Sequence, residues 1–400
     1  MPDKNSACLD GVRVLDLSRV LAGPFCTQLL GDLGAEVIKI EQPGKGDDTR
    51  QWGPPWFHGE SAYYLSCNRN KKSVTINLQA EAGRALVRQL AAHCEVLVEN
   101  FKTGAMAKWG LGYSALREAN PRMIFCAITG YGQTGPLAAR PGYDFIIQAQ
   151  GGLMSITGEP NGEPCKTGVA VADIVTGLYA HNAILAALFH RERTGEGQFI
   201  DIALFDAQIS WLANVAMNYL VTGEPPKRYG NSHPNIVPYQ TFATADGYLA
   251  LGVGNDGQFQ RLCEQLALPE LARDARFQTN GGRIENRGRI VEILQKVFFQ
   301  HTTAEWIEQL AAAGIPAGPI NTVGQALAEP QIAAREMIVE VMHPGGEALK
   351  FLGPVPKFSA TPARIQSPPP LLGQHTSEVL RELLKINEDE ITQLRQQRII

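Results

Sequence analysis

The first 130 residues alternate between short apolar runs and longer segments in which apolar residues recur with helical spacing. Runs of four to eight β-branched residues indicate strands, and a period near 3.6 indicates helices. Strict alternation of the two favours a doubly wound α/β domain with a parallel sheet and right-handed crossovers. Ligands of such sheets bind at the carboxyl ends of the strands. The expected strands are 12–17, 36–41, 73–77, 95–99 and 123–129, and the expected helices between them are 23–33 and 82–92.

The second half of the chain has a different pattern of expected elements. A long apolar helix is expected over 173–193, then a strand over 198–203 and a helix over 205–221. A stretch rich in Pro, Gly and Asn follows, which is typical of a linker. A strand and several helical segments after it indicate a smaller α+β domain, and a Pro-rich tail leads to a terminal amphipathic helix. The expected division is a large domain over 1–222, a linker and small domain over 223–328, and a return to the large domain over 329–400.

Charge and cysteine content exclude several classes of protein. Thirty-six Lys and Arg against 40 Asp and Glu leave a net charge of −4, so an anionic ligand must be held by a local cluster. The seven cysteines are never spaced C-x-x-C, which indicates neither a disulfide framework nor a zinc site. The polar N-terminus and the lack of a long apolar run predict a cytoplasmic protein, or a mitochondrial matrix protein in a eukaryote after removal of a transit peptide.

A literal G-x-G-x-x-G spans residues 252–257, after one expected strand and before a helix. This pattern is a dinucleotide-binding fingerprint only inside a βαβ unit. No second parallel strand follows within the next 40 residues, so we interpret the glycines as a tight turn. A dinucleotide-dependent oxidoreductase would rest on this motif alone.

A basic cluster, Asn68-Arg69-Asn70-Lys71-Lys72, lies between an aromatic pair and an expected strand. Short basic runs are commonly solvated turns. The functional alternative is a phosphate clamp, because Arg offers paired donors and Lys a mobile charge.

Asp173 stands at the very start of the long expected helix. Aspartate is a preferred N-cap residue, which accounts for its position without any catalytic role. The two roles are compatible, because a helix N-terminus favours the ionised carboxylate and an ionised, partly desolvated carboxylate can act as a covalent nucleophile. If Asp173 were only a cap, the chain could be a catalytically silent ligand-binding protein.

Ordered segments spread over nearly the whole chain carry a resemblance: residues 9–16, 22–24, 34–41, 98–101, 130–136, 168–177 and 369–376. Together they resemble the class III CoA-transferases, the family of formyl-CoA transferase and carnitine CoA-transferase. The resemblance implies a Rossmann-like large domain built from both chain ends, a smaller α+β domain, and two subunits threaded through each other as interlocked rings.

The resemblance also implies roles for individual residues. Asp173 matches the catalytic aspartate. The segment Asn68, Arg69, Asn70, Lys71 and Lys72 and the basic residue Lys108 match positions that hold CoA, while Trp52 and Tyr143 match aromatic residues near the acyl group. The implied substrates are an acyl-CoA and a free carboxylic acid, with a second copy of the chain as partner, and no tightly bound cofactor, metal, nucleic acid or membrane.

The implied reaction is a double displacement through an acyl-aspartyl anhydride and an aspartyl-CoA thioester. One carboxylate, oxyanion donors and exclusion of water suffice for it.

Departures from the family pattern narrow the substrate. Racemases of the superfamily carry a His before the Asp in the segment matching 142–144, where this chain has Tyr143; a phenol, with a pKa of ~10, is poorly matched to proton abstraction at neutral pH. Formyl-CoA:oxalate transferases have Gln in place of Leu21 and a poly-glycine loop absent here, so oxalate is the least expected acid.

The strongest local similarity is to members that transfer CoA from succinyl-CoA to glutarate, over 46–55, 63–66, 68–73, 236–240 and 314–321. A dicarboxylate needs a cation for its distal carboxylate, and Arg19 and Arg50 are candidates by type. Itaconate, mesaconate, malate or a carnitine-like acid are the alternatives within the family.

Overall fold

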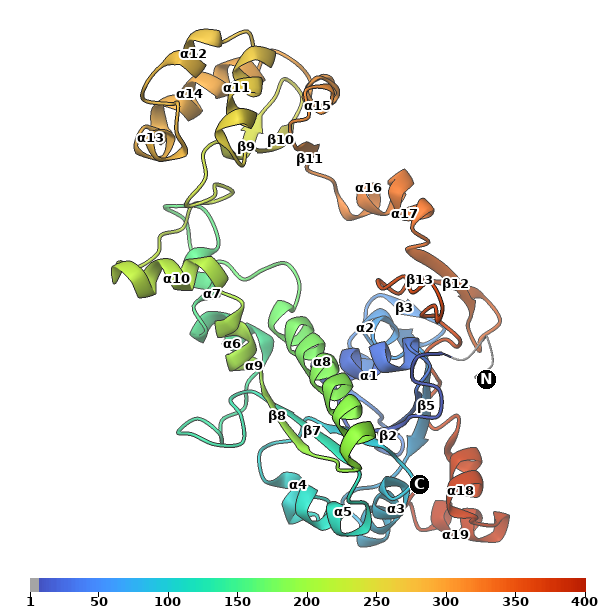
Figure 1. The fold of residues 1–400 in the computed structure, drawn as a ribbon. Coiled ribbons are helices and arrows are strands. Elements are labelled where there is room, and N and C mark those ends of the chain that lie inside the picture. The colour runs from blue at the N-terminus through green and yellow to red at the C-terminus, as the bar shows by residue number, and fades with distance from the viewer. Residues whose placement is uncertain (1–6) are drawn as a thin grey trace. The chain divides into compact units, whose positions relative to one another are not determined.

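The structure, a computed structural model, describes residues 7–400 (Figure 1). Its contacts divide the chain into two compact units. The first contains the residues up to Leu153, Lys166–Met217 and Pro330–Ile400, and the second contains Met154–Cys165 and Asn218–Glu329. The first unit therefore draws on both ends of the chain.

A six-stranded sheet, parallel throughout, forms the centre of the first unit, as the alternation predicted. The strand order is β5-β2-β1-β6-β7-β8, so the chain builds outward from β1 in one direction and then from β6 in the other. The switch point lies between β1 and β6, where an open α/β sheet binds its ligands. The strands are β1 Arg13–Asp16, β2 Glu36–Glu41, β5 Lys71–Thr75, β6 Val96–Glu99, β7 Ile124–Thr129 and β8 Phe199–Ala203.

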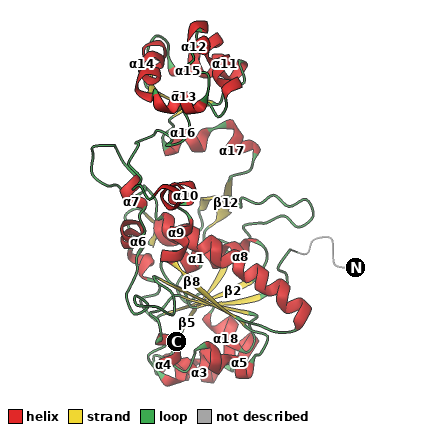
Figure 2. Ribbon diagram, turned by 60° about the vertical axis from the view of Figure 1, so that its left-hand side comes forward, coloured by secondary structure: helices red, strands yellow, loops and turns green. Residues whose placement is uncertain are grey.

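Helices cover both faces of this sheet (Figure 2). Successive strand residues point to opposite faces, which is why Val14 belongs to the core under α1 (Ala22–Asp32) and α8 (Val171–Thr194), and Leu15 to the core under α3 (Glu81–Ala91) and α18 (Thr376–Leu384). The other elements of this unit are η1 Asp48–Gln51, β3 Trp56–Phe57, β4 Glu60–Ser61, α2 Ala62–Ser66, α4 Ala105–Lys108, α5 Tyr113–Ala119, α6 Asp144–Gln150, α9 Leu204–Ser210, α17 Pro330–Ala334, β12 Ile338–Met342, β13 Ala348–Leu352 and α19 Glu388–Gln396.

Two expectations about local structure are wrong. The third strand begins at Lys71 rather than at residue 73. The two lysines looked like part of a polar turn, but Lys71 is buried and pairs with Asp16. The single helix expected over 205–221 is divided into α9 and α10 (Ala213–Thr222), and α10 begins at a left-handed residue, Ala213 (φ 45°).

The second unit is built on a three-stranded antiparallel sheet in the order β11-β10-β9, with a core of its own under five helices. The G-x-G-x-x-G motif joins β10 to α11 in this antiparallel sheet, which confirms that it is not part of a dinucleotide-binding βαβ unit. The elements are β9 Tyr239–Ala243, β10 Tyr248–Gly252, α11 Asp256–Gln265, α12 Pro269–Arg273, α13 Asn280–Glu285, α14 Arg287–Phe298, α15 Thr303–Ala312, β11 Ala317–Pro319 and α16 Val323–Ala328, with α7 (Leu153–Ile156) at a junction.

Among the residues that the structure describes, one helix, α8, is long and apolar enough to cross a membrane by length and composition. Several of its apolar residues, among them Ala180, Ile184 and Leu188, belong to the core of the first unit. We therefore interpret α8 as a core helix. The cytoplasmic location stays a prediction.

Candidate functional site

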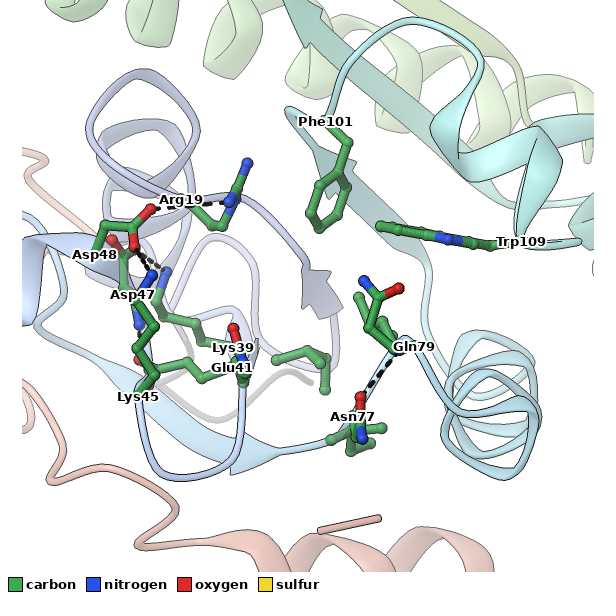
Figure 3. A pocket seen from close by; sticks show the side chains of 15 residues that line it. Arg19, Lys39, Glu41, Lys45, Asp47, Asp48, Asn77, Gln79, Phe101 and Trp109 are labelled. Atoms are coloured by element: carbon green, nitrogen blue, oxygen red, sulfur yellow. Dashed lines mark hydrogen bonds and ion pairs between the residues drawn. The ribbon is translucent and has the colours of Figure 1, made fainter. Parts of the chain in front are cut away.

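Two cavities open at the switch point, beyond the carboxyl ends of β1 and β6. One of about 270 Å³ is lined by charged side chains and by Phe101 and Trp109, and is shown in Figure 3. The other, of about 180 Å³, contains Asp173. Arg19, Asp48 and Phe101 line both cavities, so the two form neighbouring parts of one site.

Asp173 lies in the first turn of α8, three residues after the N-cap Ala170, and is not the cap. The expectation that it caps the helix is therefore wrong. Asp144 at the start of α6 takes that role, because its Oδ1 accepts hydrogen bonds from the backbone N–H groups of Ala172 (2.8 Å) and Asp173 (3.4 Å). The carboxylate of Asp173 is left free to face the cavity.

The loop before α8 is held by Gln148, which is fully buried. Its amide donates to Asp144 Oδ2 (2.7 Å), and its Oε1 accepts from the backbone N–H of Thr167 (3.0 Å). Asp144 and Gln148 share one helix turn as residues i and i+4, so α6 supplies a rigid support for the start of α8.

Burial raises the pKa of Asp173 to about 7, and the neighbouring Asp144 carboxylate adds to the rise. The helix N-terminus favours the ionised form, but burial works against it at Asp173 and keeps part of the carboxyl protonated at neutral pH. A carboxyl with this pKa is poised between its two forms near pH 7, and the ionised, poorly solvated form is reactive toward an electrophile.

Replacing Asp144 with Asn should move the acidic limb of the pH–rate profile downward. Asn keeps an acceptor for the two N–H groups but removes the charge, so the pKa of Asp173 should fall. In the unchanged enzyme we expect kcat/KM for acyl-CoA to rise with pH, with a midpoint at about 7. In the variant the midpoint of this rise should lie ~0.5–1 pH unit lower, the order expected of one partly screened charge. An unchanged or higher limb would contradict this prediction. Asp144→Ala removes both the charge and the hydrogen bonds at the start of α8. Comparing its pH–rate profile with that of Asp144→Asn separates the effect of the hydrogen bonds from that of the charge.

The two candidate arginines differ sharply in placement. Arg19 follows β1, lines both cavities and keeps 46% of its side chain exposed. Arg50 is buried, and its guanidinium donates to Glu41, Glu60, the Tyr64 hydroxyl and the carbonyl of Pro370. A substrate could reach Arg50 only by breaking these bonds, so of the two Arg19 is the cation available at the site.

The basic cluster does not form an exposed clamp. Arg69 is buried and pairs with both carboxylate oxygens of Asp32 (2.9 and 2.6 Å), and Lys71 is wholly buried against Asp16 (3.1 Å). Asn68 accepts from Lys71, and Asn70 donates to Asp32. Lys72, at the surface, bridges two glutamates, Glu36 (2.9 Å) and Glu378 (2.8 Å). The side chains of this segment thus join β5 to its neighbours, and the two buried cations are not placed to receive a phosphate.

The remaining sequence candidates are spread around the site. Leu21 and Tyr143 line the cavity that contains Asp173, and the Tyr143 side chain is largely exposed. Trp52 packs edge-on against Tyr63, with ring centroids 5.0 Å apart. Lys108, at the end of α4, is exposed and lines neither of these two cavities.

Several residues of the site were not singled out from the sequence. Burial and then the Asp173 carboxylate raise the pKa of the Tyr63 phenol, which indicates that Tyr63 lies close to Asp173. Asp48 and Trp109 line the larger cavity. The aromatic pair beside the basic cluster, and the local similarity over 63–66, were the sequence signals that could have pointed to Tyr63.

Comparison with known proteins identifies the family. The model of CoA-transferase family III matches residues 9–376. The chain belongs to CoA-transferase family III. It is 48% identical over 386 residues to a mouse protein named succinyl-CoA:glutarate CoA-transferase, covering 96% of this chain and 88% of the relative. A protein of Agrobacterium fabrum named succinate–glutarate CoA-transferase is also 48% identical, over 96% and 97% of the two chains.

Other members of CoA-transferase family III differ in the acid that their names give. A Chloroflexus aurantiacus protein, 38% identical over 98% of each chain, is named for succinyl-CoA and D-citramalate. Among solved structures, a CaiB/BaiF family protein from Brucella suis is 49% identical and superposes with a TM-score of 0.84, covering 95% of this chain and all of the other. The protein is therefore a class III CoA-transferase, and enzymes of this kind use CoA thioesters as substrates.

Proposed function

We propose that this enzyme moves CoA from succinyl-CoA to glutarate or a similar C4–C6 dicarboxylate, with Asp173 as the covalent nucleophile. The observation that carries the proposal is the placement of the Asp173 carboxyl, with its pKa raised to about 7, in a cavity that it shares with the cation Arg19. The names of the two relatives at 48% identity support the choice of acids.

In the first half-reaction a carboxylate oxygen of Asp173 attacks the thioester carbonyl. The carbon–sulfur bond breaks, CoA leaves as a thiolate, and an acyl-aspartyl anhydride forms. The thiolate then attacks the aspartyl carbonyl, so the donor acid leaves as a carboxylate and CoA remains on Asp173 as a thioester. The acceptor carboxylate repeats both steps in reverse, which conserves the thioester without ATP.

We propose that the larger cavity receives the nucleotide end of CoA. Lys45, with 49% of its side chain exposed, is a cation of its lining that is open to solvent. Phe101 and Trp109, whose ring centroids are 5.0 Å apart, supply aromatic surface beside it. Cations suit phosphates and an aromatic face suits adenine. This assignment replaces the clamp of Arg69 and Lys71, whose side chains are held in buried ion pairs. Lys108 and Lys72 stay candidates for an outer contact with a phosphate.

We propose a homodimer, in line with the resemblance. A group of large apolar side chains on α6 and on the α9–α10 segment of the first unit is exposed in the single chain, including Phe145, Ile146, Ile209, Trp211 and Met217. Exposed apolar surface of this extent is typical of protein interfaces.

A panel of free acids tested with succinyl-CoA, with product masses read directly, tests the proposed reaction. Glutarate and near dicarboxylates should give the corresponding acyl-CoA and free succinate in equal amounts. Itaconate, mesaconate, malate, carnitine and oxalate serve as the competing acceptors, and preferential transfer to one of them would reassign the acid. Failure of every acid would contradict the proposed reaction.

A further inference from the structure

The loop that carries Arg19 has its backbone held by side chains on both sides. Asn100, the residue directly after β6, accepts a hydrogen bond from the Arg19 N–H (2.8 Å) and donates one to the Arg19 carbonyl (2.6 Å). Since β1 and β6 are parallel neighbours, the residues that follow them meet at the switch point. One amide side chain therefore fixes both polar groups of the Arg19 backbone.

The residues on either side of Arg19 are bound by a buried ion pair. Lys39 Nζ donates to the carbonyl of Ser18 (2.9 Å), and Asp47 accepts from the N–H of Val20 (3.3 Å). Lys39 and Asp47 pair with each other at 2.9 Å, and both side chains are fully buried. Burial by itself would raise the pKa of Asp47, but the Lys39 charge together with hydrogen bonds from Lys39 and Thr49 lowers it to about 2, so this pair stays ionised throughout the neutral range.

This loop also stores backbone strain. Val20 has φ 70°, in the left-handed region that β-branched residues rarely adopt. Such a conformation persists only where the surroundings impose it, and strained residues cluster at functional sites. Here the surroundings are Asp47 and the held backbone of Ser18 and Arg19.

The guanidinium of Arg19, in contrast, makes only weak contacts within the protein. Its guanidinium lies over the Phe101 ring at 4.9 Å, and Nη1 is 3.9 Å from Asp48, which pairs more closely with Lys45 at 2.6 Å (Figure 3). A fixed backbone with an available guanidinium suits recognition of a second anionic group, because little order is lost when the contact forms.

We infer that Arg19 selects acids with a distal carboxylate, and that Asn100 is the positioning residue that holds Arg19 for this contact. The inference deepens the proposed function and rests on it. Asp173 takes the reacting end of the acid, and Arg19, in the same cavity, takes the far end. Arg50 takes no part, since its donors are engaged within the protein.

The test compares glutarate with pentanoate, an acid of the same carbon count without the distal carboxylate. Succinyl-CoA is the donor throughout. In a double displacement, kcat/KM for the acceptor reports the second half-reaction alone, so the ratio of the two values measures selectivity at this step. Arg19→Met keeps the unbranched stem of the side chain and removes the charged guanidinium. The glutarate-to-pentanoate ratio should fall about 10–100-fold, the range for a charge-assisted hydrogen bond.

Asn100→Ala should lower the same ratio about 3–10-fold, because Arg19 keeps its charge but loses two of its backbone contacts. Asn120→Ala is the matched control, since Asn120 also donates to a backbone carbonyl (Cys94) and accepts from an N–H (Arg122), but it lies before β7, at the amino ends of the strands and away from the site. Its ratio should match that of the unchanged enzyme. If Asn100→Ala does not fold, Asn100→Ser, which keeps a shorter polar group, replaces it.

An unchanged ratio in Arg19→Met would overturn the inference while leaving CoA transfer in place. Equal losses for both acids in a folded Asn100 variant would overturn the positioning role. Lack of transfer to any acid by the unchanged enzyme is a different result, and it would contradict the proposed function itself.

Discussion

An Asp173→Asn enzyme is expected to fold normally and to lose CoA transfer by at least ~10³-fold, the order found when a covalent nucleophile is removed. The amide is neutral and cannot form the anhydride. The fold should be retained, because Asp144 rather than Asp173 accepts the hydrogen bonds at the start of α8. The measurement is steady-state transfer from succinyl-CoA, with thermal unfolding as the check on folding.

Trapping provides an independent readout for the same residue. Hydroxylamine with acyl-CoA should inactivate the unchanged enzyme and modify Asp173, because an activated aspartyl group is electrophilic. Asp206→Asn, an exposed aspartate on α9, is the matched control and should keep full activity and the same adduct. Near-normal turnover in folded Asp173→Asn, or an adduct mapped to another residue, would remove the nucleophile assignment.

Replacing Arg69 with Ala is expected to destabilise the protein by ~3–5 kcal/mol, the cost of leaving one partner of a buried ion pair alone. An exposed phosphate clamp would instead respond with a selective rise in KM for acyl-CoA. Arg69 and Asp32 are both buried, and burial raises the pKa of Asp32 in spite of the two hydrogen bonds from Arg69. The free energy of unfolding in urea is the measurement.

The double variant Asp32→Leu with Arg69→Met should recover most of the lost stability, because an apolar pair needs no compensating charge. Arg122→Ala is the control: its ion pair with Glu192 is at the surface, with both side chains more than half exposed, and its removal should change the free energy of unfolding by no more than ~1 kcal/mol. A stable Arg69→Ala protein with a raised KM for acyl-CoA alone would instead support the hypothesis that Arg69 binds a phosphate of CoA.

The alternation of strands and helices was sufficient to predict the parallel sheet, because parallel neighbours need a crossover connection and a helix supplies it. Successive residues of a strand point to opposite faces, so Val14 and Leu15 enter opposite cores. The G-x-G-x-x-G motif could be rejected on the same ground, since the element that follows it is a helix and the required strand is missing. Asp173 was identified by the resemblance of its segment, not by periodicity.

The sequence did not predict which residues far apart in the chain form hydrogen bonds or ion pairs with each other. Asp144 caps a helix 28 residues away, Asp32 neutralises Arg69 across 37, and Pro370 closes the shell around Arg50 across 320. These pairings give Arg69 and Arg50 structural roles, although both looked available to a ligand. They also leave Asp173, which looked like a helix cap, free to face the cavity. By itself the sequence predicted the main strands and helices of the first unit, the family, and Asp173 as the candidate nucleophile. The tertiary structure alone decided which charges are buried and which face the cavity, because burial and pairing depend on segments that only folding brings together.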